Sequence, residues 1–159
     1  MPKPRIIHLL SQAQHALLRH ADRHLLDRVG VTSTQLAALL YVEERHGCSL
    51  KELGRGLGLN APAAGALAER LERLGFATRR TSDMDARSTR IDLAPEGRNV
   101  LARARPLVTE FNDRILDGMS PDDIRIVTRF LDGIRTRFSG GNDPSAPPPS
   151  NSRAEVEHG

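Results

Sequence analysis

The sequence predicts a mainly α-helical fold with one small β-hairpin. Apolar residues recur at the three- and four-residue spacing of amphipathic helices over most of residues 5–138. The spacing changes over residues 76–81 and 89–93, which are short, β-tolerant runs on either side of a polar stretch. The chain has 159 residues, which is enough for one domain with a sizeable core and too few for two large ones.

The first two predicted helices are separated by a short turn. The first covers residues 5–29, and Gly30 ends it. Thr32 and Gln35 then have the spacing of a capping box, in which each side chain satisfies a backbone amide of the other residue. This signal predicts a second helix that runs to about His46.

Two shorter helices follow. Ser49 and Glu52 repeat the capping-box spacing and open the first of them. Asn60 is the expected cap of the second, and its side chain must reach the amide of Ala63 because Pro62 has no N–H. The predicted core stripe of this second short helix is Leu67, Leu71 and Leu74.

Two long helices are predicted after the hairpin. Pro95 suits the first turn of a fifth helix that continues to Gly118. Ser120 is the expected cap of a sixth helix, with Asp122 and Asp123 at the positive end of its dipole. The predicted core stripe of the sixth helix is Ile124, Val127, Leu131, Ile134 and Phe138.

The net charge of +3 hides an uneven distribution along the chain. Residues 51–105 carry 11 basic and 7 acidic side chains, whereas residues 106–159 carry 6 and 9. A basic centre is expected where one face meets a polyanion, although a solvated mixed-charge surface gives a similar count. Arg supplies all but two of the 23 basic residues, which suits phosphate recognition but also follows from a GC-rich genome.

Composition argues against several classes of protein. No apolar run is long enough to cross a bilayer, and residues 1–20 lack the apolar core of a secretory signal. We therefore expect a cytoplasmic protein without membrane contact. No nucleophile motif, glycine-rich phosphate loop or pair of carboxylates in helical placement appears, so we expect neither catalysis nor a cofactor.

The single cysteine, Cys48, excludes an internal disulfide and a multi-cysteine metal site. It follows the second predicted helix and does not lie in the first helix, near groups that would lower the pKa of a sensing thiol. We therefore expect Cys48 to pack as a small hydrophobe rather than to sense oxidants.

The two short helices and the hairpin after them form a predicted winged helix-turn-helix. The second helix of such a pair is narrow enough for the major groove of DNA. The tip of the hairpin can reach phosphates or the minor groove beside it. This arrangement predicts double-stranded DNA as a partner.

Four stretches of the sequence carry a family resemblance. They are Thr32-Ser33-Thr34-Gln35-Leu36, Ser49-Leu50-Lys51-Glu52-Leu53 with Leu57-Gly58-Leu59-Asn60, Arg70-Leu71-Glu72-Arg73-Leu74-Gly75-Phe76 with Arg79, and Asp85-Ala86-Arg87 with Leu93 and Gly97. In this order they resemble the MarR family (multiple antibiotic resistance regulators) of bacterial transcriptional regulators, and the outer helices fit that family too. The Asp-x-Arg wing with its following Leu and Gly is the most specific of the four.

The resemblance implies a homodimer in which the first, fifth and sixth helices of two copies interlock. It assigns residues 1–30 and 95–138 to dimerisation and residues 31–94 to DNA binding. Residues 139–159 hold four of the ten prolines and almost no apolar residues, so we expect a disordered tail there. The implied function is a repressor that binds a pseudo-palindromic operator as a homodimer.

The expected DNA-binding residues lie on the second short helix, which the resemblance makes the recognition helix, and on the wing. They are Asn60, Pro62, Gly65, Ala66, Glu69, Arg70, Arg73, Arg79, Asp85 and Arg87. Family members usually place polar or basic residues where Gly65 and Ala66 stand. Base reading by this helix is therefore expected to be limited to methyl contacts, close backbone approach and Glu69 accepting from a cytosine amine. Gly65 either allows that approach or reflects genomic bias.

Specificity is then expected to depend on the wing, DNA shape and dimer spacing. Arg87 is expected in the minor groove, oriented by Asp85. The arginines expected on or near phosphates are Arg70, Arg73, Arg79 and Arg80.

The resemblance also implies release from DNA by a small aromatic or phenolic effector. The candidate effector-binding residues are His15, Tyr41 and Phe111, with core packing as the alternative for the two aromatic ones. The whole chain has five aromatic residues and no Trp, which favours core packing.

Two other functions are alternatives to an effector-released repressor. His20 and His24 have the four-residue spacing that lets two imidazoles share a metal, although two ligands alone do not make a site. A metal-responsive regulator is therefore one alternative. The bare face around Gly65 and Ala66 suggests the other, a winged-helix interaction module with weak or no specific DNA binding.

Overall fold

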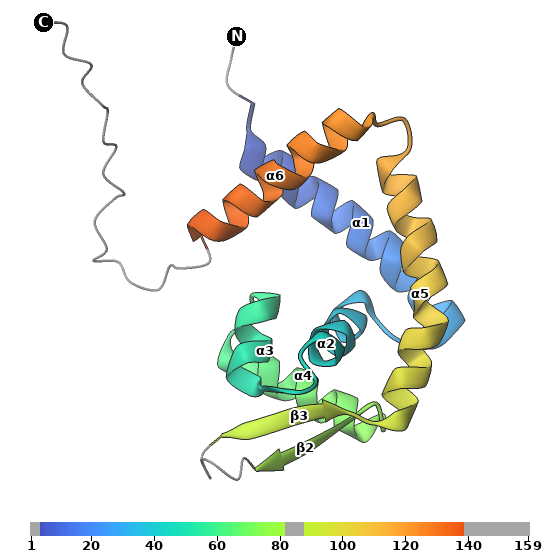
Figure 1. Cartoon of the computed structure of the whole chain (residues 1–159), viewed down its shortest axis with the longest axis vertical. Helices are drawn as coiled ribbons and strands as arrows, with labels where there is room; N and C mark the ends of the chain where they lie inside the picture. Colours follow the sequence, from blue (N-terminus) through green and yellow to red (C-terminus); the bar gives the residue numbers. More distant parts are fainter. Residues whose placement is uncertain (1–3, 82–87, 139–159) are drawn as a thin grey trace, which may run out of the picture. The chain divides into compact units, whose positions relative to one another are not determined.

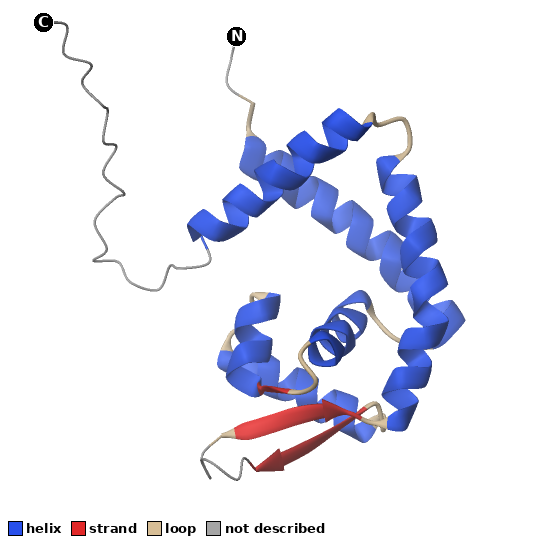
Figure 2. Cartoon of the chain, in the orientation of Figure 1, coloured by secondary structure: helices blue, strands red, loops and turns tan. Residues whose placement is uncertain are grey.

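The computed structural model describes residues 4–81 and 88–138, and it shows a mainly helical chain with a small three-stranded antiparallel sheet (Figures 1 and 2). The fold class predicted from the sequence is confirmed. The chain divides into two compact units, Met1–Asp117 and Gly118–Gly159. Among the described residues, none of the helices combines the length and apolar character that a membrane span requires.

The first unit contains all of the described strands. Its elements are α1 (Ile6–Val29), α2 (Ser33–Glu44), β1 (Cys48–Ser49), α3 (Leu50–Leu57), α4 (Ala61–Arg73), β2 (Ala77–Thr81), β3 (Thr89–Leu93) and α5 (Pro95–Leu116). The second unit contains α6 (Pro121–Phe138).

Local signals in the sequence set the starts of the helices. The Thr32 hydroxyl accepts a hydrogen bond from the N–H of Gln35 at 3.2 Å, and the N–H of Thr32 donates to Gln35 Oε1 at 2.9 Å. Ser49 and Glu52 make the same exchange at 3.2 and 2.7 Å. Both predicted capping boxes are therefore confirmed. Because such bonds join residues three apart, they form as soon as the first turn closes.

The sheet has the order β1-β3-β2, with β3 in the centre (Figure 2). Strands β2 and β3 are the predicted hairpin, with Arg79 opposite Ile91. Strand β1 was not predicted, because two residues are too few to show an alternating pattern. Cys48 in β1 pairs with Ile91 from the other side, so the fully buried Ile91 lies at the centre of the sheet.

The core of the first unit takes side chains from both the helices and the sheet. Its largest fully buried members include Leu39, Leu53, Leu71, Ile91 and Leu101, which come from α2, α3, α4, β3 and α5. The prediction that Leu74 packs in this core is wrong. Leu74 is 44% exposed because α4 ends at Arg73 and Leu74 is its C-cap, beyond the buried stripe.

The second unit begins with the predicted cap. The Ser120 hydroxyl accepts from the N–H of Asp123 at 3.2 Å, and the Asp123 carboxylate accepts from the Ser120 N–H at 3.0 Å. The prediction of a buried stripe along this helix is wrong for the single chain. No residue of α6 is buried, and Leu131 is 47% exposed.

The start of α5 lies against the start of the hairpin. The Phe76 carbonyl accepts from the N–H of Ala94 at 3.0 Å. A Cβ added at Gly97 would lie 2.0 Å from that same carbonyl oxygen, closer than any real contact allows. Glycine at position 97 therefore lets the first turn of α5 touch the hairpin backbone.

We expect Gly97→Ala to lower the free energy of unfolding by about 1–3 kcal/mol, the usual cost of overpacking a buried contact. Gly65→Ala is the matched control, because a Cβ at this helical glycine meets nothing within 4 Å. That change should raise stability by about 1 kcal/mol through helix propensity alone. Urea unfolding of the three proteins measures both effects, and equal stability of Gly97→Ala and the wild type would contradict the contact.

Candidate nucleic-acid interface

The helix α4 presents one free face to solvent. Its buried residues, Ala64, Ala68 and Leu71, lie on the side that packs into the core. The helical period therefore places Pro62, Ala66, Glu69 and Arg73 on the opposite side, and all four are exposed, as is the flanking Arg70. Five of the ten candidate DNA-binding residues thus lie on or beside one exposed surface.

The start of α4 is fixed by a side chain. Asn60 Oδ1 accepts from the N–H of Ala63 at 2.9 Å, as the sequence predicts. Pro62 occupies the first turn, where a missing N–H costs nothing. The exposed first turn of α4 therefore presents small apolar side chains and backbone to solvent, and few polar side chains.

The half-buried Gly65 has open space beside it, because an added Cβ would meet nothing within 4 Å. Packing inside the described part of the chain therefore does not require glycine at this position.

Two arginines of α4 have free side chains. Arg70 and Arg73 are exposed, and neither makes a side-chain hydrogen bond or ion pair with any residue that the structure describes. Both lie in the last turn of the helix. They are cations that a phosphate can reach without displacing another partner.

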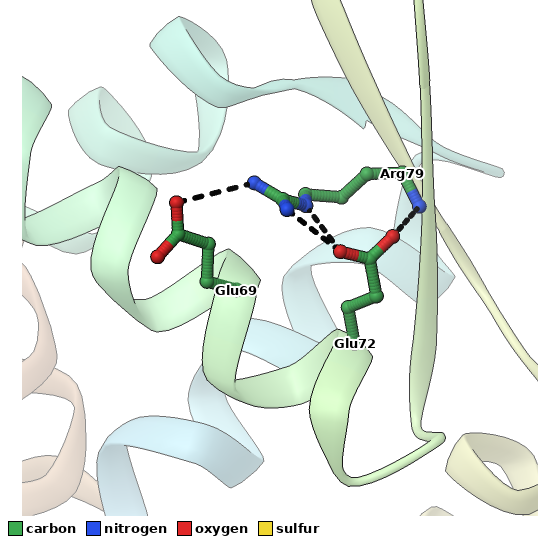
Figure 3. A network of polar contacts seen from close by, with 3 residues as sticks. All are labelled: Glu69, Glu72 and Arg79. Carbon is green, nitrogen blue, oxygen red and sulfur yellow. Dashed lines mark hydrogen bonds and ion pairs between the residues drawn. The ribbon is translucent and has the colours of Figure 1, made fainter.

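Arg79 behaves differently from these two arginines (Figure 3). Its Nε donates a hydrogen bond to Glu72 Oε2 at 2.8 Å, and its Nη2 forms an ion pair with the same oxygen at 2.7 Å. Its Nη1 lies 3.6 Å from Glu69 Oε1. The guanidinium of Arg79 thus lies between two carboxylates of α4.

The strand period explains why Arg79 and Arg80 have different partners. Successive side chains of a strand point to opposite faces, so Arg79 shares the inner face with the buried Ala77. Arg80 lies on the other face, where its Nε donates to Asp92 Oδ2 at 3.0 Å. Glu72 and Asp92 were not among the candidates from the sequence, although alternation along β2 already separates the two arginines.

The charge on Glu72 responds to this contact. The hydrogen bond from the Arg79 side chain holds the pKa of the Glu72 carboxyl below its ordinary value. Glu72 therefore stays ionised in moderately acidic solution, and the ion pair persists there.

The wing residues Asp85 and Arg87 lie outside the described residues.

A separate cavity of about 340 Å³ lies between α1, α2 and α5. Its wall is mainly apolar and includes Leu25, Leu36, Val108 and Phe111. Phe111 therefore lies where a ligand can touch it. The cavity is lined by no residue of α3 or α4, but it borders α2, which precedes the two short helices of the helix-turn-helix.

Two of the candidate effector-binding residues lie elsewhere. His15 is exposed on α1 and is not part of the lining of this cavity. Tyr41 packs against α3, where a Cβ at Gly56 would overlap its ring, and the Arg45 guanidinium lies 3.6 Å from the ring centre. The contacts of Tyr41 are those of a packed aromatic residue.

The polar side of the cavity is formed around His20. Its ring stacks on Phe111 with centroids 5.7 Å apart, and Arg114 Nη1 lies 3.2 Å from His20 Nε2. Burial and the neighbouring charges of His24 and Arg114 lower the pKa of His20.

The rings of His20 and His24, the pair considered for a metal, have centroids 4.2 Å apart. No group of three or more metal-ligating side chains is found among the described residues.

Cys48 is almost fully buried beside Ile91 in the sheet. Burial raises the pKa of its thiol, and the nearby Glu52 carboxylate acts in the same direction. A raised pKa leaves little thiolate, which is the form that reacts with oxidants. The expectation that Cys48 is a packed small hydrophobe agrees with these contacts.

We expect Cys48 in the native protein to resist alkylation at about pH 8, close to the ordinary thiol pKa of about 8.5. In urea the same thiol should react at the rate of a free cysteine. Mass spectrometry after a timed iodoacetamide reaction, with and without urea, measures the difference. Equal rates in the two solutions would argue that the thiol is accessible in the folded protein.

Comparison with known proteins finds transcriptional regulators. The model of the MarR family matches residues 29–88. The organic hydroperoxide resistance transcriptional regulator of Bacillus subtilis is 34% identical over 73 residues, which are 46% of this chain and 50% of that protein. The matches to curated relatives span 50–68% of the lengths of those proteins.

Solved structures resemble the chain over more of its length. The transcriptional repressor CouR bound to a 23-mer DNA duplex is 30% identical, with a TM-score of 0.71, and the match covers 79% of this chain and 89% of that one. NadR in complex with 4-hydroxyphenylacetate shares the fold at 21% identity, with a TM-score of 0.70 over 84% of this chain and 94% of that one.

Proposed function

Because this chain belongs to the MarR family of transcriptional regulators, we propose that it is a repressor that binds a pseudo-palindromic operator as a homodimer. The observation that carries this proposal is the exposed face of α4, where Arg70 and Arg73 have no side-chain partner among the described residues. CouR, which is 30% identical, is bound to a DNA duplex in its solved structure.

The proposed contacts with DNA are of two kinds: contacts that recognise bases or DNA shape, and contacts with phosphates that position the protein. Small residues on α4 let the helix backbone approach the bases closely, and Glu69 accepts a hydrogen bond from a cytosine amine. Arg70 and Arg73 bind phosphates and set the register. Arg87 enters the minor groove, oriented by Asp85, and supplies recognition of DNA shape.

The proposed dimer covers the apolar residues of the outer helices. In the single chain α6 has no buried residue, and Val127 and Leu131 are 41 and 47% exposed. The exposed large apolar residues of α1 are Ile6, Ile7, Leu9, Leu17, Leu18 and Leu26. Exposed apolar surface on this scale marks an interaction site in a folded protein. Residues 1–30 and 95–138 of two copies provide a dimer interface of this chemistry.

The proposed effector site is the cavity between α1, α2 and α5. Its volume of about 340 Å³ and apolar wall suit a small aromatic or phenolic molecule stacked near Phe111. Arg114 and His20 supply polar contacts at one side. A ligand that fits one arrangement of these helices better than another shifts the spacing of the two recognition helices and releases DNA.

We expect binding to an operator duplex to fall steeply between about 50 and 200 mM salt. Arg73→Ala should reduce the slope of log K against log salt by about 0.9, the value for one lost phosphate contact. Arg73→Lys keeps the charge and serves as the control, with an unchanged slope. Arg87→Ala should weaken binding strongly. Fluorescence anisotropy on a duplex selected from a randomised library by the wild-type protein gives these quantities.

Two results would count against this proposal. Absence of binding even at about 50 mM salt would favour a winged-helix interaction module without specific DNA binding. Binding by Arg87→Ala equal to that of the wild type would remove the minor-groove role of the wing.

We expect Leu131→Glu to convert the protein from a dimer to a monomer, because a carboxylate cannot be buried in an apolar interface without a partner. The matched control is Arg125→Glu, on the opposite, polar face of α6, where the Arg125 side chain is 74% exposed. Sedimentation equilibrium measures the mass of each variant. A dimeric Leu131→Glu protein would place the interface away from this face.

A further inference from the structure

We infer that Arg79 is a positioning residue of the DNA-binding surface and not a phosphate contact. It fixes strand β2 against the recognition helix α4 and holds Glu69 on the face that meets the bases. This inference rests on the proposed DNA binding. It assigns to Arg79 a role different from that of Arg70 and Arg73, which are proposed to bind phosphates.

The first argument is that each of the three guanidinium nitrogens of Arg79 already faces a carboxylate. Nε and Nη2 point at Glu72 Oε2, and Nη1 faces Glu69 Oε1 (Figure 3). The Arg79 side chain is 28% exposed. A phosphate would have to displace a charge-assisted contact of 2.7 Å, whereas Arg70 and Arg73 are exposed and make no such contact with residues 4–81 or 88–138.

The second argument is that Glu72 binds the backbone as well as the side chain of Arg79. Its Oε1 accepts from the Arg79 N–H at 3.3 Å, while its Oε2 accepts from the guanidinium. One carboxylate of α4 therefore holds the strand at two points. The chain between them is short, and the N–H of Phe76 donates to the Leu71 carbonyl at 2.9 Å. Together these bonds fix the direction in which β2 leaves α4.

The third argument concerns Glu69. Its contact with Arg79 is longer, at 3.6 Å against 2.7 Å for Glu72, and its side chain is 61% exposed. One oxygen of Glu69 is thus drawn toward Arg79, and the other is free to accept from a base amine. Because Glu69 lies on the face of α4 proposed to meet DNA, Arg79 also lowers the repulsion between this carboxylate and the phosphates.

The two roles make opposite predictions for conservative variants. If Arg79 is a clamp, that is, a residue that positions β2 and Glu69, both conservative variants should bind DNA more weakly. Arg79→Lys loses affinity because an ammonium cannot reproduce the planar fork of the guanidinium, and Glu72→Gln loses affinity because the acceptor loses its charge. If Arg79 binds a phosphate, Arg79→Lys retains binding and Glu72→Gln strengthens it by freeing the guanidinium.

The test uses the full-length chain and the duplex that the wild-type protein selects from a randomised library. Failure of the wild type to select any duplex would refute the proposed function itself. Given selection, we expect Arg79→Lys and Glu72→Gln each to lower affinity about tenfold, and the Glu72→Gln/Arg79→Lys double variant to lose no more than either single variant. Wild-type affinity in Arg79→Lys, or tighter binding by Glu72→Gln, overturns the inference.

Two further readouts separate positioning from a general loss of structure. Carboxyl carbon NMR titration should give Glu72 a pKa below the ordinary range in the wild type and an ordinary pKa in Arg79→Lys. Repeating the selection should show that Arg79→Lys and Glu69→Gln lose preference for the same G·C pair. An unchanged Glu72 pKa, or unchanged base preference in Arg79→Lys, contradicts the clamp even where affinity falls.

Discussion

Burial of one side of α4 is the constraint on which the candidate interface depends. Ala64, Ala68 and Leu71 are buried, and Ala68 and Leu71 belong to the core cluster that includes Ile91 of the sheet. Burying a Leu or Ile side chain contributes about 1.5–3 kcal/mol, so rotating the helix about its axis would cost much of this stabilisation. The helical period then decides which residues face outward. The small residues and Glu69 are exposed because their neighbours are needed inside.

The arginines of this region fall into two groups once their partners are known. Arg79 and Arg80 each face a carboxylate, from Glu72 and Asp92, whereas Arg70 and Arg73 face none in the part of the chain that the structure describes. The positive charge of residues 51–105 is therefore concentrated on fewer side chains than a count of the sequence suggests. For an interface with DNA, the free cations supply attraction, and the paired ones fix geometry.

The cavity shares the helix α2 with residues 31–94, the segment proposed to bind DNA, and this gives the proposed regulation a physical route. Asp22 of α1 accepts from both the N–H and the hydroxyl of Ser33 at 2.6 Å, at the first residue of α2. Ser33 also lines the cavity, together with residues of α1 and α5. A ligand that moves α1 relative to α5 therefore acts on the start of α2. Coupling of this kind requires two arrangements with different affinity for the ligand.

Much of the fold could be predicted because its signals are local. The caps at Thr32, Ser49, Asn60 and Ser120 join residues three apart, and a spacing in the sequence is enough to reveal them. The hairpin and the family motifs were found for the same reason. Leu74 was misassigned because helical spacing continues past the residue where the helix ends.

The sequence by itself determined the order of the elements, their caps and the winged helix-turn-helix. Only the tertiary structure decided that β1 pairs with β3, that α6 has no buried stripe in the single chain, and that Arg79 binds Glu72. The strand pairing and the contact of Arg79 depend on where the backbone returns after a turn. The exposure of α6 depends on whether a second protein surface covers it. Spacing along the chain carries no record of either, because contacts between elements are set by the packing of the whole core.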